Sequence, residues 1–150
     1  MQYWLIKSEP DAFSIDDMQQ ANVEPWDGIR NYQARNFMRD QMNIGDQVFF
    51  YHSSCPQPGI VGVCEVASAP YADPTAFDPE EKYYDPKSDP ENPSWMLVDM
   101  KFVSKFASVI SLSELKTFEA LRDMRLLKKG NRLSIMPVEA SEWSFIMSLT

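Results

Sequence analysis

The sequence has few of the residues that metal centres and many catalytic sites require. Its 150 residues include one histidine, His52, and two cysteines, Cys55 and Cys64. A histidine-rich metal site or a Ser-His-Asp relay would have to use His52, and these three residues alone form a poor zinc set. The sequence therefore predicts no metal centre.

Glycine is also scarce, with five residues, and no glycine-rich phosphate loop is present. The nearest candidate, residues 59–62, lacks the third glycine and the lysine of such a loop, so we expect no nucleotide or other cofactor. No apolar run approaches the roughly 20 residues that a membrane-spanning helix needs. We therefore expect no membrane partner.

Positive charge is in the minority. Fourteen Lys and Arg face 22 Asp and Glu, for a formal net charge of -8, which argues against coating nucleic acid through a general electrostatic field. The acidic residues crowd into residues 73–91, whereas basic residues form two groups, in residues 30–39 and 122–132. A locally basic face on an acidic protein stays compatible with this distribution.

The length is that of one compact domain, which we predict to span residues 1–150. The N-terminal residues lack the basic, apolar and small-residue regions of a secretory signal, which predicts a cytoplasmic location. In that reducing compartment Cys55 and Cys64 are expected as free thiols.

Periodicity and turn residues predict short strands separated by helices. The expected strands span residues 3–7, 47–52, 59–67, 95–103 and 132–138, and the expected helices 14–21, 32–42, 111–116, 118–127 and 140–149. Residues 68–94 are proline-rich but contain aromatics, which indicates an ordered irregular excursion with one helical turn near 74–77. With little sign of βαβ units, we predict an α+β fold with a curved antiparallel sheet or open barrel of five to six strands and flanking helices.

Residues 26–36 combine an indole, a phenol, two guanidiniums and two amides around a single glycine. A loop that turns at Gly28 and enters a helix near Tyr32 would present flat aromatic faces together with planar donors. Such a combination suits a flat polar ligand. We therefore place the mouth of a binding site at this segment.

Further polar and aromatic residues exceed what a hydrophobic core requires. A nucleobase lifted from its stack needs aromatic walls and amide or hydroxyl groups on its hydrogen-bonding edge. Trp26 and Trp95 are candidate walls, and Ser8, Asn31 and Ser53 are candidate edge readers. The predicted pocket comprises Lys7, Ser8, Trp26, Arg30, Asn31, Tyr32, Asn36, Tyr51, His52, Ser53, Tyr84 and Trp95.

Several segments together resemble a known family. Residues 4–10, 26–36, 51–53, 59–62, 84–88 and 132–134 are similar to the EVE domain, which has a PUA-like fold related to YTH readers. The resemblance implies a barrel-like sheet and a pocket for a modified base in DNA or RNA, such as a methylated or hydroxymethylated cytosine. It implies that Trp26 belongs to an aromatic cage. The residues expected at phosphates are Arg35, Arg39, Lys87 and Arg132.

Three functions are compatible with these observations. The first is a non-catalytic reader that binds nucleic acid through a modified cytosine or adenine. The second is a hydrolase of modified nucleosides or nucleic acid, with His52 and Lys7 as acid-base groups and Ser53 or Cys55 as nucleophile. The third is a protein-interaction module whose acidic loop, residues 73–91, recruits a basic partner.

Overall fold

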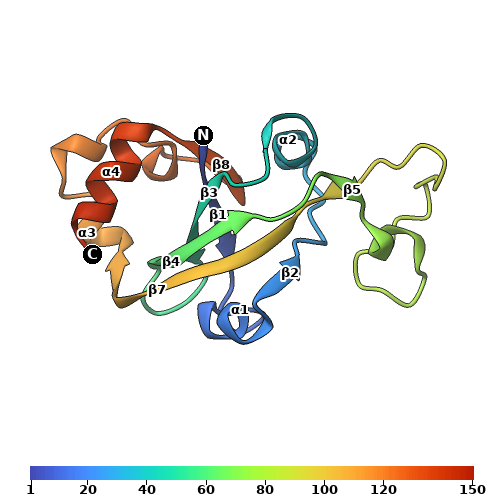
Figure 1. The fold of residues 1–150 in the computed structure, drawn as a ribbon, viewed down its shortest axis with the longest axis horizontal. Helices are drawn as coiled ribbons and strands as arrows, with labels where there is room; N and C mark the ends of the chain where they lie inside the picture. Colours follow the sequence, from blue (N-terminus) through green and yellow to red (C-terminus); the bar gives the residue numbers. More distant parts are fainter.

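The computed structural model describes all residues 1–150 and is built on one curled six-stranded sheet that forms a half-barrel. Helices flank the sheet, and a long loop extends from one end (Figure 1). The strand order is β2-β7-β4-β3-β1-β8. These strands are β1 (Tyr3–Ser8), β2 (Val23–Pro25), β3 (Gln47–His52), β4 (Gly59–Val66), β7 (Asp99–Ser111) and β8 (Ile135–Val138). The predicted α+β class with a curved sheet is confirmed.

One strand pair departs from the antiparallel pattern. β1 and β3 run parallel, whereas the other neighbouring pairs in this sheet are antiparallel. Parallel strands need a long crossover, and here it contains α1 (Ile15–Ala21), β2, α2 (Tyr32–Asn36) and the π-helical turn η1 (Phe37–Gln41). This crossover carries the segment that we identified as the mouth of a site.

The sheet separates two hydrophobic clusters, and alternation along the strands assigns each side chain to one of them. Phe50 faces the cluster under α1 and α2, whereas its neighbours Phe49 and Tyr51 face the cluster under α4 (Ala140–Ser148). Because β3 is apolar on both faces, it occupies a central position in the sheet. Trp143 of α4 stacks on Phe49 with ring centroids 3.8 Å apart.

The helix starts follow the capping signals in the sequence. Ser14 accepts a hydrogen bond from the Asp17 amide and Ser111 accepts one from the Glu114 amide, at the starts of α1 and α3 (Leu112–Leu115). The predicted helix over 32–42 divides into α2 and η1. The predicted helix over 118–127 forms two 3-10 turns instead, η3 (Glu119–Leu121) and η4 (Arg125–Leu127). None of the helices has the length and apolar character needed to cross a bilayer.

The glycines of β4 permit close backbone approach to β7. A Cβ at Gly62 would collide with the Ser104 carbonyl and lie 2.8 Å from Ile15. The register between the two strands shifts beside Gly62, which increases the local twist. β4 can therefore bend while Ile15 of α1 still packs against it.

The acidic excursion, residues 68–94, is ordered and anchored to the rest of the molecule. It begins at β5 (Tyr71–Ala72), continues through the predicted helical turn η2 (Pro74–Phe77) and returns at β6 (Met96–Leu97), which pairs with β5. Asp73 is 1% exposed and accepts hydrogen bonds from the Gly28 amide and the Arg30 guanidinium. These contacts attach the loop to the segment between β2 and α2.

Candidate functional site

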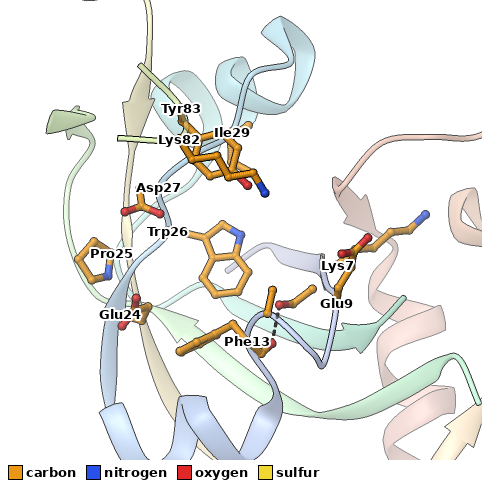
Figure 2. A pocket seen from close by; sticks show the side chains of 13 residues that line it. Lys7, Glu9, Phe13, Glu24, Pro25, Trp26, Asp27, Ile29, Lys82 and Tyr83 are labelled. Atoms are coloured by element: carbon orange, nitrogen blue, oxygen red, sulfur yellow. Dashed lines mark hydrogen bonds between the residues drawn. The ribbon is translucent and has the colours of Figure 1, made fainter. Parts of the chain in front are cut away.

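A cavity of about 550 Å³ lies where three segments of the chain converge. Figure 2 shows its lining residues around Trp26. They come from the end of β1 and the turn after it, from β2 and the loop that follows, and from the acidic excursion: Lys7, Ser8, Glu9, Ala12, Phe13, Glu24, Pro25, Trp26, Asp27, Gly28, Ile29, Lys82 and Tyr83. The volume lies within the range of small-molecule pockets.

Trp26 forms the floor of this cavity. Its indole is 8% exposed and packs edge to face against Phe13 and Phe50, with ring centroids 6.1 and 5.8 Å away. The indole nitrogen has no protein partner and is not sealed from solvent. In Figure 2 this nitrogen points into the open space above the ring. Trp26 therefore offers the cavity an unpaired N–H donor as well as part of an aromatic surface.

Tyr83 forms a second aromatic wall of the cavity, and the position of its ring depends on Gly28. This glycine has a φ of +77°, and a Cβ there would lie 2.6 Å from the Tyr83 ring. The Gly28 amide also donates to Asp73 Oδ2 at 2.9 Å. Because no side chain stands in the way, the Tyr83 ring packs directly on the backbone next to Trp26.

The charged lining residues are mostly acidic. Burial raises the pKa of Glu24, and the nearby Asp27 charge adds to this effect. The pKa of Asp27 is also raised, first by burial and then by the charges of Asp73 and Glu81. Figure 2 places Asp27 and Glu24 on one side of Trp26, so carboxylate acceptors line that side of the cavity.

The lysines at the cavity have different surroundings. The Lys7 ammonium lies 5.8 Å from the centroid of the Tyr51 ring, and burial lowers its pKa. Figure 2 shows this side chain extending away from Trp26, with Lys82 beside Tyr83 on another side of the cavity. Ser8 lines the cavity, but its hydroxyl donates to the Phe13 carbonyl at 2.6 Å. Of the predicted pocket residues, Lys7, Ser8 and Trp26 thus come together.

Trp95, predicted as a second wall of the same pocket, lies in a separate cluster. Its indole N–H donates to Asp85 Oδ2 at 2.8 Å, and its ring stacks on Tyr32 at 4.8 Å. Arg30 lies between the cavity and this cluster. Its guanidinium carbon is 5.3 Å from the Trp95 centroid and 5.7 Å from the Tyr83 centroid. Arg30, Tyr32 and Trp95 therefore form an aromatic and cationic cluster behind the cavity wall.

The end of β3 also points elsewhere than predicted. Strand alternation directs Tyr51 into the core beneath α4, where it is 4% exposed. His52 Nε2 accepts a hydrogen bond from the Ile15 amide at 3.1 Å. The pKa of His52 is lowered, mainly by burial. The Ser53 amide donates to the Ser8 carbonyl, so this strand end supports the cavity from outside and does not line it.

Three other predicted pocket residues, Asn31, Asn36 and Tyr84, have local structural partners. Asn31 caps α2 by accepting from the Ala34 amide at 2.9 Å, and Asn36 Oδ1 accepts from the Arg35 guanidinium at 2.8 Å. The Tyr84 amide closes a turn onto the Glu81 carbonyl in the acidic excursion. None of Asn31, Asn36 and Tyr84 lines the cavity.

The four predicted phosphate contacts lie outside the cavity as well. Arg35 is half-buried beside Tyr32, and Arg39 forms an ion pair with Asp40 at 2.8 Å. Lys87 is exposed in the acidic excursion, and Arg132 is exposed just before β8. These residues come from separate segments of the chain, and Arg35 and Arg39 share the acceptor Asn36.

Several lining residues were not predicted from the sequence. Glu24 and Asp27 flank Trp26 in the chain, and that proximity was the one available signal for them. Phe13, Lys82 and Glu9 carry no comparable signal, because their place at the cavity depends on how the turn after β1 and the acidic excursion fold back. No three His, Cys, Asp or Glu side chains gather in a way that could hold a metal ion.

The fold defines a PUA-like α+β domain, with an open cavity beside Trp26. The chain belongs to the EVE domain family, whose sequence profile matches residues 2–149. Thymocyte nuclear protein 1 of Rattus norvegicus is 43% identical over 98% of this chain and 73% of its own length.

Two solved structures illustrate the likeness in three dimensions. A protein from Pseudomonas syringae is 50% identical, covers 98% of both chains and superposes with a TM-score of 0.94. Human THYN1 protein, solved in complex with DNA that contains 5-methylcytosine, is 39% identical over 99% of this chain and 97% of its own, with a TM-score of 0.93.

These relatives contradict the cytoplasmic location expected from the N-terminal residues. The rat and mouse relatives are both named thymocyte nuclear protein 1. A secretory pattern bears only on the secretory route, so it does not distinguish cytoplasm from nucleus. The prediction was wrong because it rested on that pattern alone.

Proposed function

We propose that this domain is a non-catalytic reader that binds DNA and receives a modified cytosine in the cavity above Trp26. The observation that carries the proposal is the cavity itself, which combines aromatic surfaces with an unpaired indole N–H and two carboxylates. The human relative solved with 5-methylcytosine DNA supports the choice of ligand.

The cavity chemistry suits the hydrogen-bonding edge of cytosine. Carboxylates accept hydrogen bonds from the cytosine N4 amine, and Asp27 and Glu24 supply such acceptors. The Trp26 N–H supplies a donor for the ring nitrogen or carbonyl oxygen of the base. Thymine presents a carbonyl where cytosine has its amine, so the same carboxylates would repel it. Adenine shares the exocyclic amine and is the alternative base.

The arrangement favours binding over hydrolysis. His52 uses Nε2 to accept a backbone N–H, and neither Ser53 nor Cys55 lines the cavity. Lys7 extends away from Trp26. The residues predicted for hydrolysis therefore form no pair of nucleophile and general base in the cavity.

The acidic excursion belongs to this site in the proposal. It supplies Lys82 and Tyr83 to the cavity, while Asp73 and Asp85 turn inward to bond Arg30 and the Trp95 indole. Recruitment of a basic protein partner through the remaining acidic residues stays a separate prediction.

The experiment compares otherwise identical labelled oligonucleotides that carry 5-methylcytosine, cytosine or thymine at one position. Wild-type protein is expected to bind the 5-methylcytosine strand most tightly. Asp27→Asn is expected to reduce the preference for 5-methylcytosine over thymine about tenfold, because each specific base contact contributes roughly 1–3 kcal/mol of discrimination. Fluorescence anisotropy measures each affinity.

Asp123→Asn is the matched control, because it makes the same charge change at a residue that does not line the cavity. It is expected to leave the preference unchanged. Equal affinity of the wild type for all three strands would contradict the proposal. Trp26→Ala is a poor probe here, since removal of a buried tryptophan costs roughly 3–5 kcal/mol of stability.

A further inference from the structure

Tyr32 presents an aromatic ring to solvent in a fixed orientation. It is 60% exposed, although large aromatic side chains usually lie at least partly inside. The ring stacks on Trp95 with an interplanar angle of 20°, and Trp95 is itself 6% exposed and bonded to Asp85. A buried and hydrogen-bonded indole therefore supports the exposed phenol from one side.

Neither Trp95 nor Arg35 covers the other face of Tyr32. The Arg35 guanidinium carbon lies 4.7 Å from the Tyr32 centroid and 5.9 Å from the Trp95 centroid. With Trp95 and Tyr32 4.8 Å apart, these three separations form a compact triangle. If Trp95 and Arg35 covered opposite faces of the phenol, they would lie much farther apart. Arg35 therefore contacts Tyr32 on the same side as Trp95 and does not cover the opposite face.

Positive charge is fixed next to this ring. Arg35 donates to the Ser94 carbonyl at 2.6 Å and to Asn36 Oδ1, and Arg39 donates to the same Asn36 oxygen at 3.2 Å. The pKa of Arg35 is lowered by burial and then by the charge of Arg39. A second anion beside these two guanidiniums would relieve their repulsion, which Asp40 relieves in part.

A chain of side-chain contacts connects the exposed Tyr32 ring to the cavity wall. Tyr83 lines the cavity, Arg30 lies 5.7 Å from the Tyr83 centroid and 5.3 Å from the Trp95 centroid, and Trp95 supports Tyr32. Two intervening side chains, Arg30 and Trp95, thus connect Tyr32 to a residue that lines the cavity. Aromatic side chains beside basic groups are the usual platform for an unpaired base and its phosphate.

We propose that Tyr32 is a second base-binding site, on which the base next to the modified one stacks while Arg35 and Arg39 contact its phosphate. This inference rests on the proposed reader function and extends it from one base to a strand segment. The site is independent of base identity, because every base has a π-face.

The test uses two 5-methylcytosine oligonucleotides, one with normal neighbours and one with abasic sites on both sides of the modified base. Tyr32→Ala is expected to weaken binding of the first about tenfold, in line with the usual contribution of base stacking. It is expected to leave binding of the second unchanged. Tyr32→Phe keeps the ring and is expected to bind both strands like the wild type.

Val103→Ala is the control for loss of an exposed apolar side chain, since Val103 is 47% exposed on β7. Thermal unfolding of each variant checks that the fold is retained. Equal loss on both oligonucleotides, or no loss on either, would overturn the second site. If the wild type ignores methylation but Tyr32→Ala still weakens binding only where neighbouring bases are present, the reader function fails and the stacking site stands. Absence of binding to any oligonucleotide overturns both.

Discussion

His52 holds the start of α1 in place through one hydrogen bond. Its Nε2 accepts from the Ile15 amide, so the neutral imidazole is the form that fits the folded state. Burial lowers the pKa of His52 from its ordinary 6.5, the Lys105 charge adds to this effect, and the Asp16 charge opposes it. Protonation therefore costs more in the folded chain than in the unfolded one.

This difference predicts a pH effect on stability. Below 6.5 the unfolded chain binds a proton at His52 before the folded chain does, so the contribution of His52 to stability falls as pH decreases. The melting temperature of the wild type is expected to drop more than that of His52→Gln between neutral pH and about pH 5. Calorimetry on both proteins measures the difference in melting temperature. The effect of the carboxylates that titrate in both proteins cancels in this comparison. Parallel pH profiles would contradict the prediction.

The single residues of the site show what sequence reasoning can reach. Trp26 was predictable because an indole in a polar, glycine-containing segment exceeds the needs of a core. Trp95 and Tyr32 gave the same signal, yet they stack on each other outside the cavity. Sequence gives the type of a side chain, whereas the direction in which its ring faces depends on contacts between residues far apart in the chain.

At the scale of elements, the loop between β2 and α2 shapes the cavity through Gly28. Gly28 and Gly45 both have positive φ, +77° and +92°. Only at Gly28 does the side chain of another residue, Tyr83, lie where a Cβ would stand. Gly45→Ala is expected to cost the strain of a left-handed residue, roughly 1–2 kcal/mol. Gly28→Ala is expected to cost about 1–3 kcal/mol more, because Tyr83 must move.

Urea unfolding of the two variants measures this difference in stability. Displacement of Tyr83 also removes a cavity wall, so Gly28→Ala is expected to weaken oligonucleotide binding, whereas Gly45→Ala keeps it. Equal unfolding free energies for the two variants would show that the Tyr83 ring adapts without cost.

Elements with strong local signals were predicted well, and those without were missed. β3 and α1 carry β-branched and aromatic runs or a capping box, and both were placed within a residue or so of their bounds. β2 and β5, with three and two residues, were missed, and the strand predicted over 95–103 divides into β6 and the longer β7. The extended conformation of β2 and β5 comes from pairing with distant partners, which no short window of sequence contains.

At the scale of the whole molecule, Asp46 connects two strands across the sheet. It is 3% exposed, and its carboxylate accepts from the Trp4 indole at 3.1 Å, from the Asn43 amide at 2.9 Å and from the Gln2 amide at 3.1 Å. These bonds join the start of β1 to the turn before β3. Hydrogen bonds to a charged group contribute roughly 1.5–3 kcal/mol each.

Asp46→Ala is therefore expected to lower the free energy of unfolding by at least about 3 kcal/mol, because the Trp4 N–H would be left unpaired inside the core. Asp46→Asn keeps an acceptor oxygen and is expected to cost less. Urea denaturation measures both, with Asp123→Ala as an exposed control, which is expected to change stability by less than about 0.5 kcal/mol. A loss for Asp46→Ala no larger than that control would show that water replaces the missing carboxylate.

The position of β1 between β3 and β8 has a consequence for synthesis of the chain. β1 lies between β3 and β8 in the sheet, so the strand made first has a neighbour that is made near residue 138. A ribosome-bound chain that has not yet released β8 exposes one edge of β1, with Leu5 and Ile6 on it. Unpaired strand edges of this kind are prone to aggregate. The domain therefore completes its sheet only after β8 has left the ribosome.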